Sequence, residues 1–160
     1  MKHYSNADRA DILHQASQLY MASNIPIDYG TGELFTPVEV HALKYIIDHP
    51  GKTVTELSRD WDKAKASVSQ MMKKLEDKGL VTRLPAPDSR RKQLYAATDQ
   101  GIALNELHRA YDERVFGTTL SPLFERHSED EIDACFRMLN EYCLARRRKH
   151  YRSQGGNPQE

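Results

Sequence analysis

Residues 64–101 decide the fold, and their sequence is AKASVSQMMKKLEDKGLVTRLPAPDSRRKQLYAATDQG. Apolar side chains recur at helical spacing over residues 64–78, which predicts a helix there. Gly79 follows at the position where a helix end favours glycine. Residues 80–84 and 93–97 then have the composition of short strands. The stretch therefore predicts a helix that leads directly into a hairpin.

The tip of this hairpin, residues 85–92, is rich in turn-forming residues and in positive charge, so we expect a loop there. Thr98 is a suitable N-cap for a long helix that extends to about Phe116. Ser121-Pro122 is expected to end that helical region, because proline lacks the backbone N–H that a helix interior needs.

Two helices are predicted before residue 64. Thr36 and Pro37 are typical of a helix start, and His49-Pro50-Gly51 ends that helix. Thr53 and Glu56 have the spacing of a capping box, which predicts a short third helix. The order helix, short helix, helix, strand, turn, strand is that of a winged helix-turn-helix domain.

Helices are also expected at both ends of the chain. Residues 8–21 place apolar side chains at helical spacing, and Ser128 and Glu131 form another capping box. Residues 24–32 hold one proline and two glycines, which predicts a loop. We thus expect a mainly α fold with a small β wing, divided into a winged helix-turn-helix domain at 36–100, a helical dimerisation region at 6–35 and 101–150, and a disordered tail at 151–160.

The chain has 23 basic and 23 acidic residues, but their distribution is uneven. Residues 52–92 carry 11 basic and 6 acidic side chains, whereas residues 1–51 carry 3 and 6, and residues 93–145 carry 4 and 10. A basic middle between acidic flanks favours a surface that binds a polyanion such as nucleic acid. An unevenly charged but purely solvated surface is the competing interpretation.

Several classes of protein are excluded. No apolar run approaches the roughly 20 residues that span a bilayer, and the N-terminus lacks the apolar stretch of a secretory signal. With only two cysteines, the chain has neither a disulfide framework nor a Cys-x-x-Cys zinc motif. It also contains no nucleophile motif or phosphate-binding glycine loop, so we expect a cytoplasmic protein that is not an enzyme and has no membrane partner.

Five short motifs lie between residues 36 and 101: Thr53-Val54-Thr55-Glu56-Leu57, Ala66-Ser67-Val68-Ser69-Gln70, Leu75-Glu76-Asp77-Lys78-Gly79-Leu80-Val81, Asp88-Ser89-Arg90-Arg91 and Thr98-Asp99-Gln100-Gly101. Together they resemble the MarR family of bacterial transcription regulators. The resemblance implies a sequence-specific repressor that binds a pseudo-palindromic double-stranded operator as a homodimer. The helix over 64–78 would be the recognition helix in the major groove, and the hairpin would reach the minor groove.

The resemblance also implies which side chains contact DNA. Glutamine can pair with adenine edges, serine can bond to bases or phosphates, and lysine neutralises phosphates. Arginine at the hairpin tip suits a narrow minor groove, and Asp88 would hold Arg90 by a charge-assisted hydrogen bond. For Lys73 and Lys74, a plain solvated helix face is the competing interpretation. The expected contacts are Lys65, Ser67, Ser69, Gln70, Lys73, Lys74, Arg83, Asp88, Arg90, Arg91 and Lys92.

The turn before the recognition helix departs from the family pattern of glycine, an aliphatic residue and serine. Here Asp62-Lys63-Ala64 occupies those places, and we expect Asp62 to cap the helix because alanine cannot. Lys63 is expected to extend to solvent. Trp61 stands where a leucine is usual, and either packs in the core or lines a ligand pocket.

Proteins of this family often bind a small phenolic or lipophilic effector between the dimerisation helices and the DNA-binding domain. The aromatic and imidazole side chains near that junction are therefore candidate pocket residues. Ordinary packing competes with ligand contact at each of them, since tyrosine and histidine are commonly half-buried. The candidates are Tyr20, Tyr29, His41, Tyr45, Trp61, His108 and Tyr111.

A zinc-responsive regulator of the same fold is an alternative, because one branch of the family senses zinc through histidines at similar places. His108 and Asp112 are spaced i, i+4 and share a helix face with each other, while His41 lies on an earlier helix. Asp28 or Glu33 would supply a fourth ligand. Asp112 stands where that branch has histidine, so we expect no metal and no other cofactor.

Three further expectations concern the outer helices and the rival functions. The residues expected to form the dimer interface are Ile12, Leu13, Leu19, Ile132, Phe136 and Leu139. Cys135 and Cys143 are too far apart on one helix to form a disulfide, so we expect apolar packing, with thiol sensing as the alternative. A winged-helix protein-interaction module is the remaining rival, although such a module does not need so basic a surface.

Overall fold

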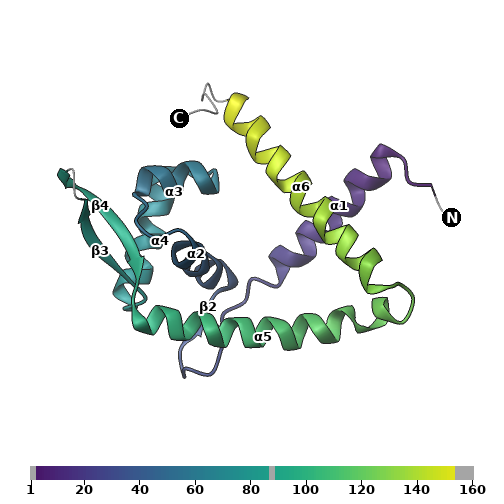
Figure 1. Cartoon of the computed structure of the whole chain (residues 1–160), viewed down its shortest axis with the longest axis horizontal. Coiled ribbons are helices and arrows are strands. Elements are labelled where there is room, and N and C mark those ends of the chain that lie inside the picture. The colour runs from purple at the N-terminus through teal and green to yellow at the C-terminus, as the bar shows by residue number, and fades with distance from the viewer. Residues whose placement is uncertain (1–2, 87–88, 154–160) are drawn as a thin grey trace.

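The structure is a computed structural model that describes residues 3–86 and 89–153. For residues 89–91 and 147–153 it describes the backbone alone. In chain order the elements are α1 (Asn6–Ala22), β1 (Ile27–Asp28), β2 (Leu34–Phe35), α2 (Pro37–Asp48), α3 (Val54–Trp61), α4 (Lys65–Asp77), β3 (Val81–Ala86), β4 (Ser89–Ala97), α5 (Asp99–Phe124) and α6 (Glu129–Ser153). Helices α2, α3 and α4 and the β3–β4 hairpin form one lobe, from which α5 leads away to α6 (Figure 1). The predicted fold, mainly helical with a small β wing, is confirmed.

Capping boxes start helices at four places. At each, a serine or threonine side chain accepts a hydrogen bond from the N–H three residues on, and an acidic side chain at that position accepts one from the N–H of the capping residue. The pairs are Ser5 and Asp8, Thr36 and Glu39, Thr53 and Glu56, and Ser128 and Glu131. Loss of such a cap typically costs about 1 kcal/mol, so these boundaries are set by local sequence.

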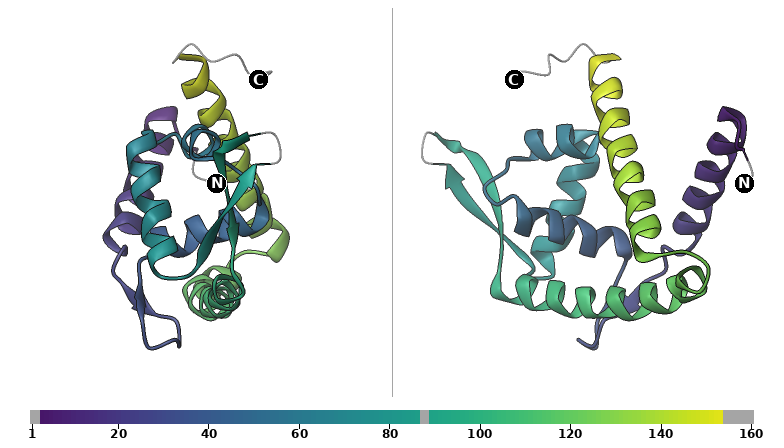
Figure 2. Two further views of the ribbon diagram at one scale, coloured as in Figure 1. Left: turned by 90° about the vertical axis from the view of Figure 1, so that its left-hand side faces the viewer. Right: turned by 45° about the vertical axis from the view of Figure 1, so that its right-hand side comes forward.

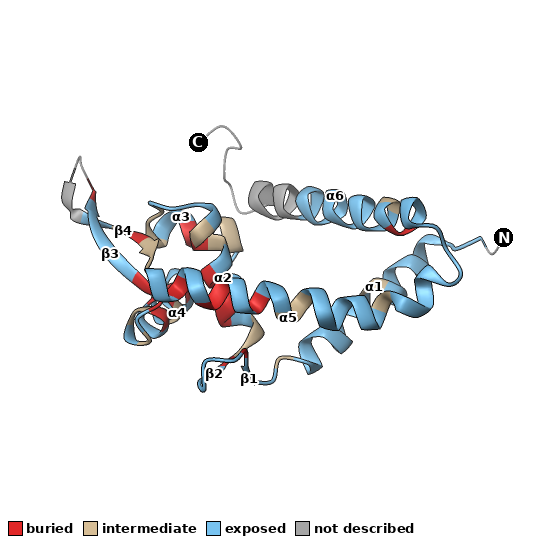
Figure 3. Ribbon diagram, turned by 60° about the horizontal axis from the view of Figure 1, so that its bottom comes forward, coloured by how far each residue is buried: buried red, intermediate tan, exposed pale blue. Residues whose placement is uncertain are grey.

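The hydrophobic core lies inside the lobe. Its fully buried apolar side chains come from β2, α2, α3, α4, the residue before β3 and the first half of α5, and the largest are Phe35, Leu43, Ile46, Leu57, Met72, Leu75, Leu80 and Leu104. Buried residues gather in this part of the molecule, whereas α1 and α6 are exposed over most of their length (Figure 3). The lobe is therefore the rigid part on which the outer helices are carried.

A closely packed junction joins α4, β3 and α5. Gly79 has φ +70°, and the N–H groups of Gly79 and Leu80 donate to Glu76 O and Leu75 O, which is a Schellman motif. The Thr98 hydroxyl donates to Gly79 O at 2.6 Å and accepts from the Gly101 N–H at 3.1 Å. The two ends of the hairpin are therefore fastened to each other at the start of α5.

The wing is an antiparallel pair of strands, β3 and β4, in which Val81 pairs with Ala97 and Leu84 with Leu94. Lys52 forms an isolated antiparallel β-bridge to Tyr95, so a third segment of chain pairs with the wing at its base. The hairpin projects from the side of the lobe, as Figure 2 shows from two directions.

Strand pairing extends further along this hairpin than predicted. Ala86 pairs with Ser89 after a register shift at Pro85, so the expectation of a loop over 85–92 is wrong for the described part of it. Residues 87–88 lie outside the described residues. Pro85 stands at this irregularity in the strand pairing. Proline is tolerated there because it has no N–H to donate to the neighbouring strand.

Two other predicted boundaries are wrong. The expected loop at 24–32 contains β1, which pairs with β2, and the Asp28 carboxylate closes the turn by accepting three backbone N–H groups. Helix α5 does not end at Ser121-Pro122, because the Glu125 N–H donates to Ser121 O and helical bonding continues past the proline. Pro122 removes one donor only two residues before the helix ends at Phe124.

The expected tail at 151–160 also begins too early, because the backbone of α6 is helical as far as Ser153. Between Ser128 and Gly155 the sequence contains no glycine or proline that would end a helix. The basic residues after 145 are also favoured near a helix C-terminus. The rest of that predicted tail, residues 154–160, lies outside the described residues.

The junction at Gly101 makes a prediction about stability. A Cβ atom at Gly101 would lie 2.2 Å from the Leu80 carbonyl oxygen, so Gly101→Ala must displace backbone. We expect Gly101→Ala to lower the free energy of unfolding by about 1–3 kcal/mol, measured by urea titration. Gly117→Ala, in the same helix but with no side chain or other element of the described structure within 4 Å of the new Cβ, should be neutral or stabilising. Equal losses in the two variants would contradict this account.

Candidate nucleic-acid interface

Helix α4 has one buried face and one exposed face. Val68, Met72 and Leu75 face the core and are at most 1% exposed. The opposite face carries the polar residues predicted to contact DNA, all of them exposed: Lys65, Ser67, Ser69, Gln70, Lys73 and Lys74. The residues at the N-terminal half are short except for Lys65 and Gln70, so the helix backbone can closely approach another surface there.

The turn that leads into α4 differs from prediction. Asp62 does not cap α4: it adopts the left-handed conformation with φ +53° and ends α3 instead, a position that aspartate tolerates. Ala64 is the N-cap of α4, and its methyl side chain makes no capping hydrogen bond. The Ser58 hydroxyl donates to Lys63 O at 2.6 Å and fixes the turn, while Lys63 itself is exposed, as expected.

A buried carboxylate holds α4 against α2. Glu39 is 1% exposed and lies 2.8 Å from Lys78 Nζ and 3.2 Å from Lys74 Nζ. Burial raises the pKa of Glu39, but hydrogen bonds from Lys78, Thr36 and Lys74 outweigh it and lower the pKa to about 2. Glu39 is therefore ionised, and the predicted DNA contact Lys74 already has an acidic partner in the structure.

The wing carries the other predicted DNA contacts. Arg83 of β3 donates to Glu76 of α4 at 2.6 Å and lies over the Tyr95 ring, so it ties the wing to α4. Arg90 and Arg91 lie on β4 near its tip end, whereas Lys92 is exposed further along the strand. The side chains of Arg90 and Arg91, the whole of Asp88 and the predicted Asp88–Arg90 bond lie outside the described residues.

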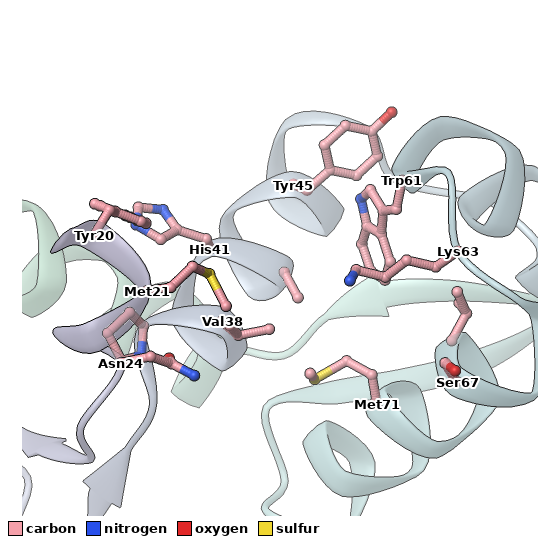
Figure 4. A pocket seen from close by; sticks show the side chains of 13 residues that line it. Tyr20, Met21, Asn24, Val38, His41, Tyr45, Trp61, Lys63, Ser67 and Met71 are labelled. Atoms are coloured by element: carbon pink, nitrogen blue, oxygen red, sulfur yellow. The ribbon is translucent and has the colours of Figure 1, made fainter. Parts of the chain in front are cut away.

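A cavity of about 530 Å³ opens between α1, α2 and the helix-turn-helix (Figure 4). Four of the seven predicted pocket residues line it, namely Tyr20, His41, Tyr45 and Trp61. Sequence reasoning did not assign the other nine to the pocket: Met21, Asn24, Pro37, Val38, Ala42, Lys63, Ser67, Val68 and Met71. Most are small or aliphatic side chains, so only the amphipathic spacing of α2 and α4 could have indicated them.

The remaining three predicted pocket residues form a ring cluster behind His41. Tyr29 packs edge-on against His108 and Tyr111, with ring centroids 5.2 and 5.1 Å apart. His108 also packs edge-on against His41 at 4.9 Å. These three side chains are not among the residues that line the cavity, and His41 is the contact between the two groups.

His41, His108 and Asp112 bring ligand atoms within 4.8 Å of one another. His108 Nε2 lies 3.1 Å from the Asp112 carboxylate, and the Tyr20 hydroxyl lies 3.0 Å from His41 Nε2. Burial lowers the pKa of His108 more than Asp112 raises it, and a neutral imidazole is the form that binds metal. Asp28, one suggested fourth ligand, is instead engaged by the turn that it closes.

The outer helices leave many apolar side chains exposed. Of the residues predicted for dimerisation, Ile132 is buried, Leu13 is half-buried, and Ile12, Leu19, Phe136 and Leu139 are exposed. Cys135 and Cys143 are also exposed, so the expected apolar packing of these cysteines is not made within the chain. Both lie on α6, on the outer part of the molecule.

Known proteins share this architecture. A MarR protein from Peptoclostridium difficile superposes with a TM-score of 0.74 at 18% identity, covering 96% of this chain and 98% of that one. Streptococcus pneumoniae FabT, solved in complex with DNA, gives 0.63 at 19% identity, covering 87% and 98%. In sequence, the HTH-type transcriptional regulator YhjH of Bacillus subtilis (strain 168) is 28% identical over 108 residues. That match spans 68% of this chain and 61% of YhjH.

The sequence profile of the MarR family matches residues 35–92, from β2 through the helix-turn-helix to the wing. In this region the chain resembles the MarR family in sequence, and its fold is that of MarR-family structures. Proteins of the MarR family are DNA-binding regulators of transcription and not enzymes. Among the described residues, no helix is both long and apolar enough to cross a membrane.

The lowered pKa of Glu39 leads to a prediction about the stability of the protein in acid. A pKa lowered from 4.5 to about 2 means that the ionised carboxylate stabilises the fold above pH 4.5 and stops doing so as the pH falls to 2. This lowering corresponds to about 3 kcal/mol. We expect Glu39→Gln, which can still accept the capping bonds, to lower the free energy of unfolding by about 2–3 kcal/mol at pH 7.

The loss in Glu39→Gln should shrink as the pH falls towards 2, and urea titrations at several pH values measure it. Glu131→Gln is the matched control, because Glu131 occupies the same capping position in α6 but is exposed. A loss in Glu39→Gln that does not change with pH, or that is no larger than in Glu131→Gln, would contradict the role given to the buried charge.

Proposed function

We propose that the protein is a transcriptional repressor that binds a pseudo-palindromic operator as a homodimer and is released by a small phenolic or lipophilic effector. The observation that carries this proposal is the exposed polar face of α4, whose Lys65, Ser69 and Gln70 side chains project away from a fully packed core. Such a face, flanked by a basic wing, matches the groove geometry and the charge of DNA.

Two comparisons support the proposal. FabT, which shares the fold, was solved in complex with DNA, and the profile match covers the same region that carries the polar face of α4 and the wing. In our proposal residues 36–100 are the DNA-binding domain, and residues 6–35 and 101–150 supply the dimer interface. Wing residues Arg90 and Arg91 would then enter the minor groove on either side of the operator.

The exposed apolar side chains of the outer helices support the homodimer. Leu19, Phe116, Phe124 and Phe136 are between 44% and 72% exposed in the isolated chain. A second copy would cover such side chains and place its own α4 one helical turn further along the DNA. An operator with two related half-sites follows from that symmetry.

The cavity supports the effector. Its walls come from α1 on one side and from α4 on the other, so a bound molecule would touch both the outer helices and the DNA-reading helix. Apart from Asn24, Lys63, Ser67 and the edges of the rings, the lining is mainly hydrophobic. A flat aromatic molecule with one polar or anionic end fits that lining.

Operator binding tests the proposal. Duplexes selected by the purified protein from a random pool should bind specifically, with an affinity that falls steeply as salt is raised. Arg90→Ala and Gln70→Ala should each weaken binding by about 1–3 kcal/mol in fluorescence anisotropy titrations. Gln70→Ala should also relax base preference at one position of each half-site.

Arg109→Ala is the control, because Arg109 is exposed on α5 and pairs only locally, with Glu106. If Arg90→Ala binds like Arg109→Ala, the wing has no part in binding. Affinity that is weak and insensitive to salt would favour a protein-interaction module instead. In the same titration, millimolar 4-hydroxybenzoate should weaken operator binding, whereas no response to any phenolic or lipophilic probe would remove the effector from the proposal.

A zinc-responsive regulator is the second candidate, and the cluster of His41, His108 and Asp112 favours it. His108 Nδ1 is buried and has no hydrogen-bond partner among the described residues, so the ring makes no structural bond with them through that atom. Two imidazoles and a carboxylate fit zinc, which takes nitrogen and oxygen ligands at about 2 Å. Zinc would have to displace the Tyr20 hydroxyl from His41.

Zinc competition against a chromophoric chelator tests this candidate. If the site is real, untagged protein binds about one zinc ion per protomer, and His108→Gln lowers the affinity at least about tenfold by removing a ligand. His127→Gln, which alters an exposed histidine beside Glu131, is the matched control. Equal zinc affinity in the two variants, or no competition with the chelator, would refute the zinc site.

A further inference from the structure

Asp60, near the end of α3, lies between the cavity and the base of the wing. One oxygen of its carboxylate accepts two hydrogen bonds, from the Tyr45 hydroxyl at 2.8 Å and from Lys52 Nζ at 2.6 Å. The Lys52 and Asp60 side chains are only 29% and 23% exposed, so water competes weakly for this pair. The two donors come from α2 and from the segment between α2 and α3.

The Lys52 side of this arrangement belongs to the wing. The Tyr95 N–H donates to Lys52 O at 3.0 Å, and the Gly51 N–H donates to Tyr95 O at the same distance. Tyr95 of β4 is itself 4% exposed, and its ring lies under Arg83. A shift of Lys52 therefore shifts the base of β4.

The Tyr45 side belongs to the cavity. Tyr45 lines the cavity beside Trp61, with the two rings packed edge-on at 5.6 Å. Figure 4 shows the Tyr45 hydroxyl pointing away from the other lining side chains, out of the cavity. A molecule that pushes on the ring from inside the cavity would move the hydroxyl that bonds to Asp60.

We propose that Asp60 is a positioning residue that couples the cavity wall to the wing through Tyr45 and Lys52. This inference rests on the proposed function, in that the wing is taken to contact DNA. When Tyr45 holds Asp60, the carboxylate fixes Lys52 and the wing keeps one position. When the hydroxyl is displaced, only Lys52 still holds Asp60, and the wing base is free to move.

Hydrogen exchange tests the coupling without DNA or effector. Tyr45→Phe removes one hydroxyl, and Asp60→Asn removes the charge at nearly constant size. Both should speed exchange of the Tyr95 and Gly51 amides at least about fivefold relative to the amides of α5, because a charge-assisted hydrogen bond is lost. Asp48→Asn is the matched control, since Asp48 pairs with Lys44 on the exposed side of α2 and touches neither the cavity nor the wing.

If the Tyr95 and Gly51 amides exchange at the wild-type rate in both variants, the coupling does not exist. The same follows if exchange rises equally throughout the core, because that result indicates a plain loss of stability. A local rise that also occurs in Asp48→Asn would likewise overturn the proposal.

Double-mutant cycles on operator affinity test whether the route runs through the wing. Asp60→Asn should weaken operator binding about three- to tenfold, and this loss should largely disappear in an Arg90→Ala background but persist in a Gln70→Ala background. Additive losses with Arg90→Ala would overturn the wing route. If the wild-type protein binds no operator, the proposed function fails, and the exchange measurement alone decides whether the coupling exists.

Discussion

The buried carboxylate of Glu39 is the interaction on which the arrangement of the lobe depends. It caps α2 from within, through Thr36, and it also pairs with Lys74 of α4 and with Lys78, the C-cap of α4. A buried charge is costly unless it is paired and hydrogen-bonded, and here every partner lies on one of the two helices. The orientation of α4 relative to α2, and hence the surface that α4 presents, is set by satisfying this one group.

A second constraint sets the direction of α5. The end of α4, the base of the wing and the start of α5 meet at Gly79, Thr98 and Gly101. This contact leaves no room for a side chain at Gly101. Because α5 is one continuous helix, the geometry at this junction also fixes where its far end and α6 lie. The lobe and the outer helices are therefore joined by a continuous helix rather than by a loop.

Local signals made most of the fold predictable. The caps at Thr36, Thr53, Thr98 and Ser128 act within three residues, so sequence alone locates the helix starts.

The features that escaped prediction depend on distant partners. Glu39 has the sequence context of a capping residue, and nothing nearby shows that it pairs with lysines on α4. Asp62 could cap either neighbouring helix, and only the packing of α3 against α4 selects the end of α3. The cavity joins residues from four helices, which no single segment reveals.

Trp61 is the one tryptophan of the chain, and the fold places it in the cavity wall between Tyr45 and Lys63. Its indole emission therefore comes from a single known position, which is half-buried and next to the Tyr45 ring. Indole emission depends on polarity and on neighbouring quenchers. The protein thus contains its own optical reporter for the cavity, and its spectrum can follow the state of this wall without an attached label.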